Sequence, residues 1–100
     1  MAKERRRIPN QLKRYRKLNK FRQKDIAEIL HSRSTSKLSE YEKGNILPSF
    51  TTVLKLSALY GTIPQELYRD YAHSISSQVR ASKREFYKRK AKQPKFYDDS

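Results

Sequence analysis

The sequence predicts an all-α fold, in which five short helices form a bundle and a further basic helix follows. Apolar residues recur at helical spacing in five segments between residues 9 and 71. The connections between these segments are only about 2 to 6 residues long, as in a helix bundle. No segment shows the alternation of apolar and polar residues that is typical of a β-strand. At 100 residues, the chain can form one small domain with a modest core.

The first two helices are predicted over residues 9–19 and from Gln23 onward. Residues 1–8, which precede them, show no helical periodicity and are expected to form a basic arm. The inward residues of the first helix are Leu12, Tyr15 and Leu18. The apolar residues of the second are Ile26, Ala27, Ile29 and Leu30. Phe21 and Ile26 are expected to pack against each other across the start of the second helix.

The third helix is predicted over residues 34–43, with Ser34 as its N-cap. Leu38 and Tyr41 are the only members of its apolar face. Gly44 is expected to end the helix in a left-handed conformation, and Pro48 prevents it from resuming. A helix with so narrow an apolar face is expected to leave most of its surface exposed.

The fourth and fifth helices have clear boundary signals. Ser49 is the predicted N-cap of a helix that runs through Tyr60 and stops at Gly61. Its expected inward residues are Val53, Leu54, Leu56, Ala58 and Leu59. Pro64 then stands at a first helical position and begins a fifth helix through about Tyr71.

A sixth helix is predicted from Tyr71 to Ala91, a stretch that contains neither Gly nor Pro. Its apolar stripe consists of Tyr71, Ile75, Val79 and Phe86. Three interpretations of this stripe stay open: it packs back onto the bundle, it forms a dimer seam, or the helix becomes ordered only on a polyanion. Pro94 is expected to end the helix.

The charge of the chain is large and unevenly distributed. The net charge is +14, with +10 in residues 1–24, −1 in residues 25–78 and +5 in residues 79–100. Such a charge favours a polyanionic partner. The chain has no cysteine, so disulfides and cysteine metal sites are excluded and a reducing compartment is permitted. No apolar run approaches the length of a membrane span or a signal sequence.

The residue types needed for an enzyme are missing from the sequence. There is no cysteine, no glycine-rich phosphate loop, and only His31 and His73 as imidazoles. No nucleophile and base are spaced for catalysis, and no group of residues has the spacing of metal ligands. We therefore predict that the chain is not an enzyme and holds no cofactor and no metal.

One sequence pattern links the first helix to the residues after the third. Its members are Arg16, Phe21, Gln23, Ile26, Ala27, Leu30, Leu38, Ser39, Tyr41, Glu42, Gly44 and Pro48. This pattern resembles the helix-turn-helix of the XRE family of bacterial and phage regulators, the Cro and lambda-repressor type. His31 stands where the family turn usually has Gly, Arg22 stands where the usual cap is Ser or Thr, and the turn is one residue longer than the commonest form.

The resemblance implies a five-helix lambda-repressor-like DNA-binding bundle with an additional basic C-terminal helix. It divides the chain into a basic N-terminal arm (1–8), a helix-turn-helix DNA-binding domain (9–72) and a basic C-terminal helix and tail (73–100). Helix 34–43 would enter the major groove of double-stranded DNA, where the exposed residues near its N-terminus reach base edges. These expected base-contacting residues are Ser34, Thr35, Ser36, Ser39 and Glu40. Glu40 is the most informative of them, because a carboxylate can accept from a cytosine amino group.

A second set of residues is expected to grip the DNA backbone without reading sequence. Its members are Gln23, Arg33, Lys37, Lys43 and Asn45. Arg5, Arg6 and Arg7 of the arm either reach along the backbone or into a minor groove, or stay in a solvated basic tail. By the resemblance, Arg16 and Glu42 form a partly buried structural ion pair.

The resemblance implies a sequence-specific transcriptional regulator, a repressor by family habit, that binds a two-fold operator as a homodimer. It also implies a bacterial or phage protein of the cytoplasm, associated with the nucleoid. The alternative is an antitoxin or anti-factor whose main partner is a protein bound through the C-terminal helix. A generic RNA or membrane-surface binder would need only the charge, and the polar face of helix 34–43 argues against it.

Overall fold

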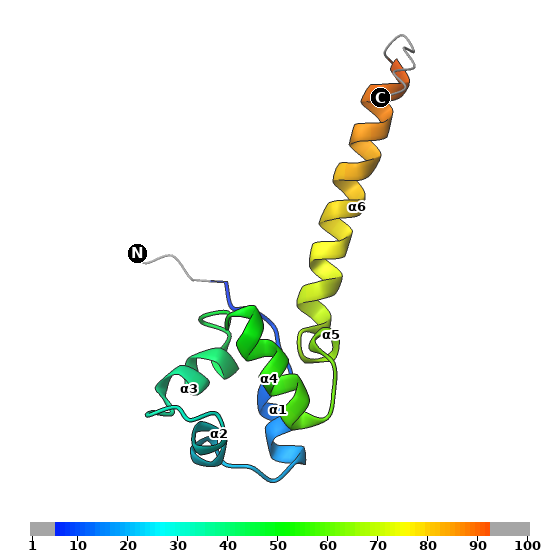
Figure 1. Ribbon diagram of the computed structural model, residues 1–100. Helices are drawn as coiled ribbons and strands as arrows, with labels where there is room; N and C mark the ends of the chain where they lie inside the picture. The colour runs from blue at the N-terminus through cyan, green and yellow to red at the C-terminus, as the bar shows by residue number, and fades with distance from the viewer. Residues whose placement is uncertain (1–5, 93–100) are drawn as a thin grey trace, which may run out of the picture.

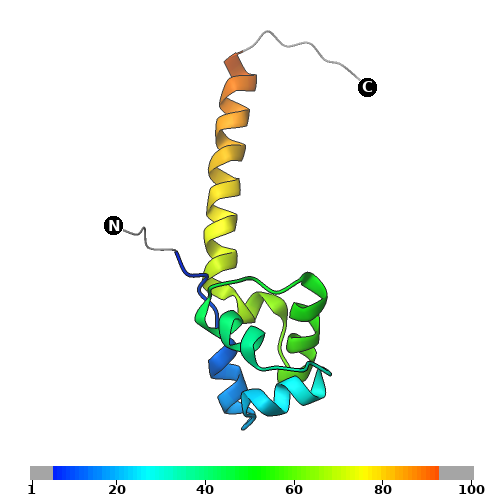
Figure 2. The same ribbon diagram turned by 90° about the vertical axis from the view of Figure 1, so that its left-hand side faces the viewer.

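The computed structural model describes residues 6–92. The secondary structure elements of this part of the chain are all helices, which are joined by loops (Figure 1). The helices are α1 (Leu12–Leu18), α2 (Gln23–Ile29), α3 (Ser36–Lys43), α4 (Phe50–Tyr60), α5 (Pro64–Leu67) and α6 (Arg69–Lys92). Helices α1 to α5 pack together, while α6 projects from the bundle as a single rod in both views (Figures 1 and 2). The predicted all-α bundle with an additional C-terminal helix is thus confirmed.

One hydrophobic core holds α1 to α5 together. Its buried apolar residues are Leu12, Ile26, Ala27, Leu38, Val53, Leu56, Tyr60, Leu67 and Tyr68. Partly buried residues surround it, among them Ile8 from the segment before α1 and Tyr71 from the first turn of α6. Because every bundle helix contributes to this core, the bundle gives α2 and α3 a fixed relative position. No helix among the described residues is long and apolar enough to cross a membrane.

The inward faces of α1 and α4 differ from the prediction in part. Leu18 is 64% exposed. It is the last residue of α1, at the end of the helix that does not pack on the core. On α4, the buried residues are Val53, Leu56, Ser57 and Tyr60, at the spacing of a single helix face. Leu54 and Ala58 lie beside that face and are exposed. The boundaries of α4 are as predicted, since Ser49 Oγ accepts from the Thr52 N–H and Gly61 is left-handed.

The start of α3 lies two residues after the predicted one. Ser34 does not cap the helix; its Oγ accepts from the backbone N–H of Ser36 at 2.9 Å and closes a local turn instead. Thr35 occupies the cap position without a side-chain hydrogen bond. The turn between α2 and α3 contains His31 with φ of +58°, a left-handed conformation that glycine adopts more easily.

The boundary between the last two helices also differs from the prediction. α5 ends at Leu67 rather than near Tyr71, because Tyr68, with φ −123° and ψ 41°, leaves the helical conformation. α6 then begins at Arg69. Of the predicted apolar stripe, only Tyr71 packs against the core, and all residues from 73 to 91 are exposed. The interpretation that the whole stripe packs back onto the bundle is therefore wrong. Pro94 and Arg5 lie outside the described residues.

Candidate nucleic-acid interface

Helix α3 buries only Leu38 among its eight residues. Leu38 and the partly buried Tyr41 attach α3 to the core. The remaining side chains are polar or charged, and α3 lies at the edge of the bundle (Figure 1). A helix attached by one narrow face can present its other faces to a ligand.

The residues predicted to contact bases fall into two places. Ser36, Ser39 and Glu40 lie on α3 itself, with Ser36 exposed and the other two partly buried. Ser34 and Thr35 lie in the turn just before the helix. The structure thus gathers all five around the first two turns of α3, although the hydroxyl of Ser34 already accepts one hydrogen bond.

Glu40 is joined to Asn45 across the C-terminal end of α3. The side-chain amide of Asn45 donates to Glu40 Oε1 at 2.9 Å, and the backbone N–H of Asn45 donates to the Glu40 carbonyl at 3.0 Å. Gly44, with φ of +79°, makes this return of the chain possible. One of the expected base readers and one of the expected phosphate contacts therefore form a single unit, which the sequence pattern did not indicate.

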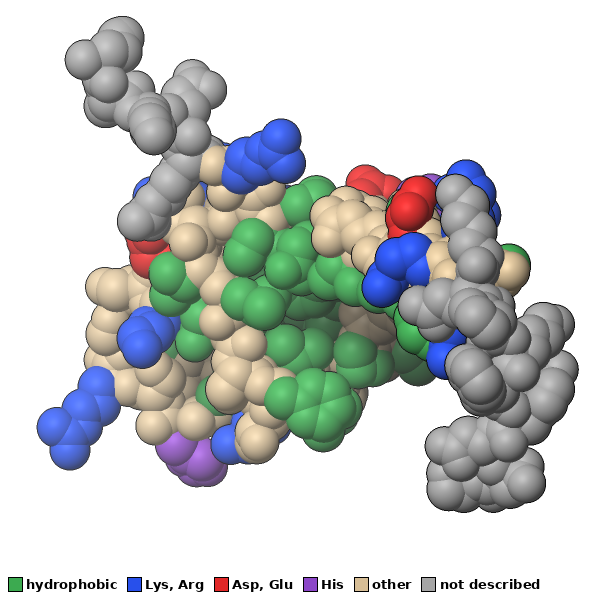
Figure 3. Space-filling view, turned by 90° about the horizontal axis from the view of Figure 1, so that it is seen from above, with side chains coloured by type: hydrophobic (Ala, Val, Ile, Leu, Met, Phe, Trp, Pro, Cys, Tyr) green, Lys and Arg blue, Asp and Glu red, His purple; other side chains and the backbone are tan. Residues whose placement is uncertain are grey.

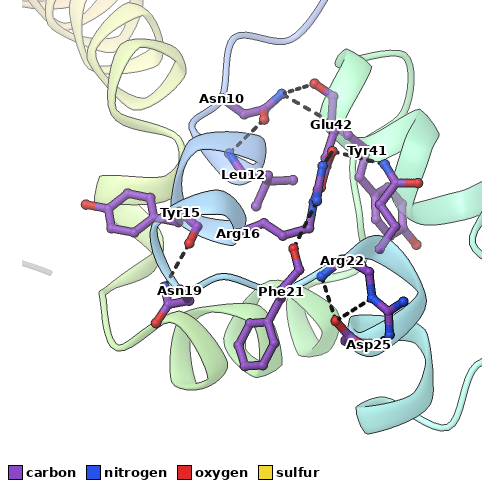
Figure 4. Close-up of polar contacts among 11 residues, drawn as sticks. Asn10, Leu12, Tyr15, Arg16, Asn19, Phe21, Arg22, Asp25, Tyr41 and Glu42 are labelled. Atoms are coloured by element: carbon purple, nitrogen blue, oxygen red, sulfur yellow. Dashed lines mark hydrogen bonds and ion pairs between the residues drawn. The ribbon is translucent and has the colours of Figure 1, made fainter.

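Arg16 and Glu42 form a bidentate ion pair at the base of α3 (Figure 4). Arg16 Nε donates to Glu42 Oε2 at 2.6 Å and Nη2 donates to Oε1 at 3.1 Å, while Nη1 donates to the Phe21 carbonyl at 3.1 Å. The two side chains are only 11% and 9% exposed. The hydrogen bond to Glu42 raises the pKa of Arg16 above its usual range. This pair ties α1 and the start of α2 to the last turn of α3.

Gln23 belongs to the same cluster. Its side-chain amide donates to Glu42 Oε1 at 3.0 Å, so the first residue of α2 is connected to α3. The sequence placed Gln23 among the phosphate contacts, and the structure adds a contact that orients its side chain. Asp25 in the same turn accepts from the Arg22 backbone N–H at 2.7 Å (Figure 4). The bond from the Arg22 side chain to Asp25 is the first cause of the lowered pKa of this carboxyl.

Basic side chains surround α3 on several sides. Arg33, Lys37 and Lys43, all predicted backbone contacts, are exposed. A groove of about 370 Å³ runs beside α3 and is lined by Arg7, Lys13, Arg16, Gln23, Ser39, Glu42 and Lys43. Within this groove the only acidic group is Glu42, whose charge is already met by Arg16. The groove therefore presents positive charge and polar hydrogen-bonding groups, which suits an anionic ligand such as a phosphate.

Asn10 attaches the N-terminal segment to the end of α3, a role that was not predicted. Its Oδ1 accepts from the Leu12 N–H at 3.0 Å and so satisfies the N–H of the first residue of α1, next to the N-cap Gln11. Its amide nitrogen lies 3.2 Å from the Tyr41 carbonyl and 3.4 Å from the Glu42 carbonyl in the last turn of α3 (Figure 4). The Ile8 N–H adds a bond of 2.8 Å to the Gly44 carbonyl. The exposed Arg6 and Arg7 therefore leave the bundle from a point beside the C-terminal end of α3.

The described residues contain no group of His, Asp and Glu side chains that could hold a metal ion. What the arrangement offers is a polar helix with cations around it, which suits the binding of an anionic ligand.

Comparison with protein families gives a match over most of the described chain. The helix-turn-helix domain, as a protein family, matches residues 10–72, which include α1 to α5 and the first turn of α6. The comparison with curated proteins and the comparison with solved structures both found no match.

Proposed function

The chain belongs to the helix-turn-helix domain family of the XRE type, and from this premise we propose that it is a sequence-specific DNA-binding regulator of transcription that acts as a repressor. The observation that carries the proposal is the polar surface of α3, which buries only Leu38 inside the matched region and lies beside the groove lined by Arg7, Lys13 and Lys43. Such a surface leaves polar side chains available to meet base edges.

In this proposal α3 enters the major groove, which is wide enough for one helix. Ser36, Ser39 and Glu40 reach base edges, and Ser34 and Thr35 reach them from the turn before the helix. The bond from Asn45 supports this role for Glu40, because it restricts the rotamers of the carboxylate and leaves one oxygen to accept from a base.

Phosphate contacts come from the cations around α3. Arg33, Lys37 and Lys43 supply charge along the helix, and Arg6 and Arg7 supply it from the arm. Gln23 and Asn45 add polar contacts from fixed positions at the start of α2 and after α3. These groups set the register of α3 and do not select the sequence.

We further propose the division of labour implied by the sequence, with residues 1–8 as an arm, 9–72 as the DNA-binding domain and 73–100 as a separate basic element. The exposure of residues 73–91 supports this division. The functional unit is a homodimer on a two-fold operator in the cytoplasm, because two copies of α3 read two half-sites.

The proposal is tested by selecting bound sequences from a random DNA pool. We expect an inverted repeat whose half-sites are about one helical turn apart. The selected operator is then mutated one base pair at a time and measured against wild type and Glu40→Gln. The variant should change the preferred base at one position per half-site, with about 1 to 3 kcal/mol of discrimination redistributed.

Glu66→Gln provides the matched control, because Glu66 lies on α5 and undergoes the same chemical change. This variant should leave the pattern of preferences unchanged. If Glu40→Gln rescales all affinities equally, as a change of charge alone would, Glu40 does not read a base. If the pool yields no preferred sequence, the chain is not a sequence-specific regulator.

A further inference from the structure

An apolar patch lies on the bundle where α4 begins. It consists of Ile46, Leu47, Phe50 and Leu54, which are 37%, 49%, 73% and 44% exposed. Phe50 and Leu54 are one turn apart on α4, and Ile46 and Leu47 lie in the loop before it. Hydrophobic side chains gather on this end of the bundle, directly beside α6, which is seen end-on (Figure 3). Contiguous apolar surface of this kind on a small domain marks an interaction site.

The apolar stripe of α6 also has no partner. Ile75 and Val79 are one turn apart and are 42% and 58% exposed. All residues from 73 to 91 are exposed, so this part of α6 has no tertiary packing to support it. Most helical stability in proteins comes from tertiary packing of an apolar face, which this part of α6 lacks, and the serines at 74, 76, 77 and 82 lower its helix propensity.

α6 follows α5 and projects away from the bundle (Figures 1 and 2). It therefore cannot cover the patch of its own chain. A second copy related by a two-fold axis can cover it. In such a pair, each α6 would lie on the patch of the other copy. The same contact would therefore occur twice, once on each side of the two-fold axis.

We propose that the patch and the stripe together form a homodimer interface. In this interface the stripe around Ile75 and Val79 of one copy packs on the patch around Phe50 and Leu54 of the other. The inference rests on the proposed function, because a two-fold operator requires two copies of the chain. The inference identifies the surface through which the second copy of the chain binds, which the proposed function leaves open.

The charges favour this arrangement over a parallel pairing of the two α6 helices. Residues 80–91 hold six basic residues and one acidic residue, so parallel α6 helices would set like charges side by side. Residues 25–78, which include the patch, carry a net charge of −1. An α6 that lies on this patch of its partner therefore faces less positive charge than a second α6 would present.

The oligomeric state tests the proposal without DNA. Sedimentation equilibrium of the full chain should show a reversible dimer. Phe50→Glu and Val79→Glu should each raise the dimer Kd at least about tenfold, because each places a charge in the apolar contact. Leu18→Glu is the control, since Leu18 is similarly exposed but ends α1 at the opposite end of the bundle (Figure 1). The control should dimerise like wild type.

Cross-linking tests the arrangement itself, and the absence of cysteine from the chain makes it clean. Phe50→Cys and Val79→Cys chains are prepared separately, one with a tag of different mass, and mixed under mild oxidation. The mixed disulfide dimer should exceed both self-linked dimers. Self-linking of Val79→Cys in preference to the mixed product would mean that the α6 helices pair with each other, and the proposal would be wrong.

A chain that stays monomeric, or a dimer that all three glutamate variants leave unchanged, would also overturn the proposal. These outcomes are separate from failure of the proposed function. Loss of sequence preference in the DNA selection would leave the dimer measurements unaffected, and a monomer that still selects an inverted repeat would contradict only the interface.

Discussion

At the scale of single residues, four left-handed backbone positions shape the bundle. They are Lys20, His31, Gly44 and Gly61, with φ of +62°, +58°, +79° and +67°. Two of these positions carry glycine and two do not. An L side chain makes this conformation costly. Substitutions at the four sites therefore distinguish the stability cost of backbone strain from the stability cost of a steric clash.

The two glycines should respond very differently to alanine. At Gly44, an added Cβ would clash with the Ile8 carbonyl oxygen and lie 2.9 Å from the Ile8 nitrogen, whereas at Gly61 it would meet nothing within 4 Å. Gly61→Ala should cost only the left-handed strain, about 1 kcal/mol. Gly44→Ala should cost at least about 2 kcal/mol more, because the Ile8 segment must move away. Urea unfolding of both variants measures the difference, and equal losses would show that the Ile8 segment shifts freely.

Replacing His31 by glycine should stabilise the chain. The imidazole is exposed, so the left-handed strain that is relieved outweighs the lost contacts and the greater freedom of glycine when unfolded. We expect a gain of about 0.5 to 1 kcal/mol in thermal or urea unfolding. His31→Ala keeps the strain and should give no gain; if both variants behave alike, the backbone at this position is not strained.

Two buried phenols should make the bundle sensitive to alkaline pH. Burial raises the pKa of Tyr60 and of Tyr68 from 10 to about 12. Their protons are therefore retained in the folded chain and lost first from the unfolded chain. The stability they contribute is present below pH of about 10 and disappears as pH rises towards about 12.

The measurement is urea unfolding at several pH values between about 8 and 12. Replacing both Tyr60 and Tyr68 by phenylalanine should flatten the alkaline decline relative to wild type. Tyr87→Phe, at an exposed position of α6, should not. The hydroxyl of Tyr68 is buried without a hydrogen-bond partner among the described residues, so its removal should not cost stability at neutral pH.

At the scale of elements, the chain is organised by how its helices begin and end. Ser49 and Gly61 bound α4, Pro64 begins α5 and Gly44 ends α3. These local signals act within a few residues. Asn10 is different, because it accepts from the first N–H of α1 and at the same time satisfies carbonyl groups at the end of α3, an element about thirty residues away.

Asn10→Ala should therefore destabilise the bundle more than the loss of one cap. We expect a loss of about 2 to 3 kcal/mol, since the Leu12 N–H and the last carbonyls of α3 lose their partner together. The control is Asn19→Ala, whose amide donates to the Tyr15 carbonyl in an exposed position. That variant should lose no more than about 0.5 kcal/mol in urea unfolding, and an equal loss in both variants would mean that the link to α3 carries little energy.

The distinction between local signals and contacts between distant elements also explains how much of the fold could be predicted from the sequence. The helical class, the order of helices and the ends of α4 rest on periodicity and local caps, and they were predicted correctly. The start of α3 was placed two residues early, because Ser34 can bond its neighbours in a turn as readily as it can cap a helix. The end of α5 was misplaced because no Gly or Pro marks the break at Tyr68.

The candidate site divides in a similar way. The pairing of Arg16 with Glu42 came from the family pattern, and the structure contains it. The bonds from Gln23 to Glu42 and from Asn45 to Glu40 depend on how α2 and α3 cross and on the return of the chain at Gly44. Spacing along the sequence does not specify such contacts. The assignment of individual residues to bases or phosphates stays a prediction.

At the scale of the whole molecule, the charge and the structural elements are both distributed unevenly along the chain. The chain carries 24 basic and 10 acidic residues, and the excess lies in its two ends. Residues 25–78 between them carry most of the core and the helix α3. If the proposed function holds, binding energy comes largely from the ends and selectivity from the middle.

DNA affinity should therefore depend steeply on salt. We expect contacts to about six to ten phosphates per dimer and an affinity loss on the order of a thousandfold between about 50 and 200 mM salt. Fluorescence anisotropy with one operator across a salt series gives the slope. Replacing Arg6 and Arg7 together by alanine should make the slope shallower without changing the preferred sequence, and a flat response of the wild-type chain would contradict electrostatic binding.

The bond between Ile8 and Gly44 has a consequence for the order in which contacts form. Arg6 and Arg7 precede Ile8 directly, so their backbone atoms stay within about 7 Å of that anchor. If the proposed function holds, the arm would meet the DNA strand near α3 as a short tether, at an effective concentration of roughly millimolar or above. Weak contacts that would never persist alone then form and re-form many times before α3 dissociates. The arm would thus lengthen the residence time of the complex while contributing little to its formation.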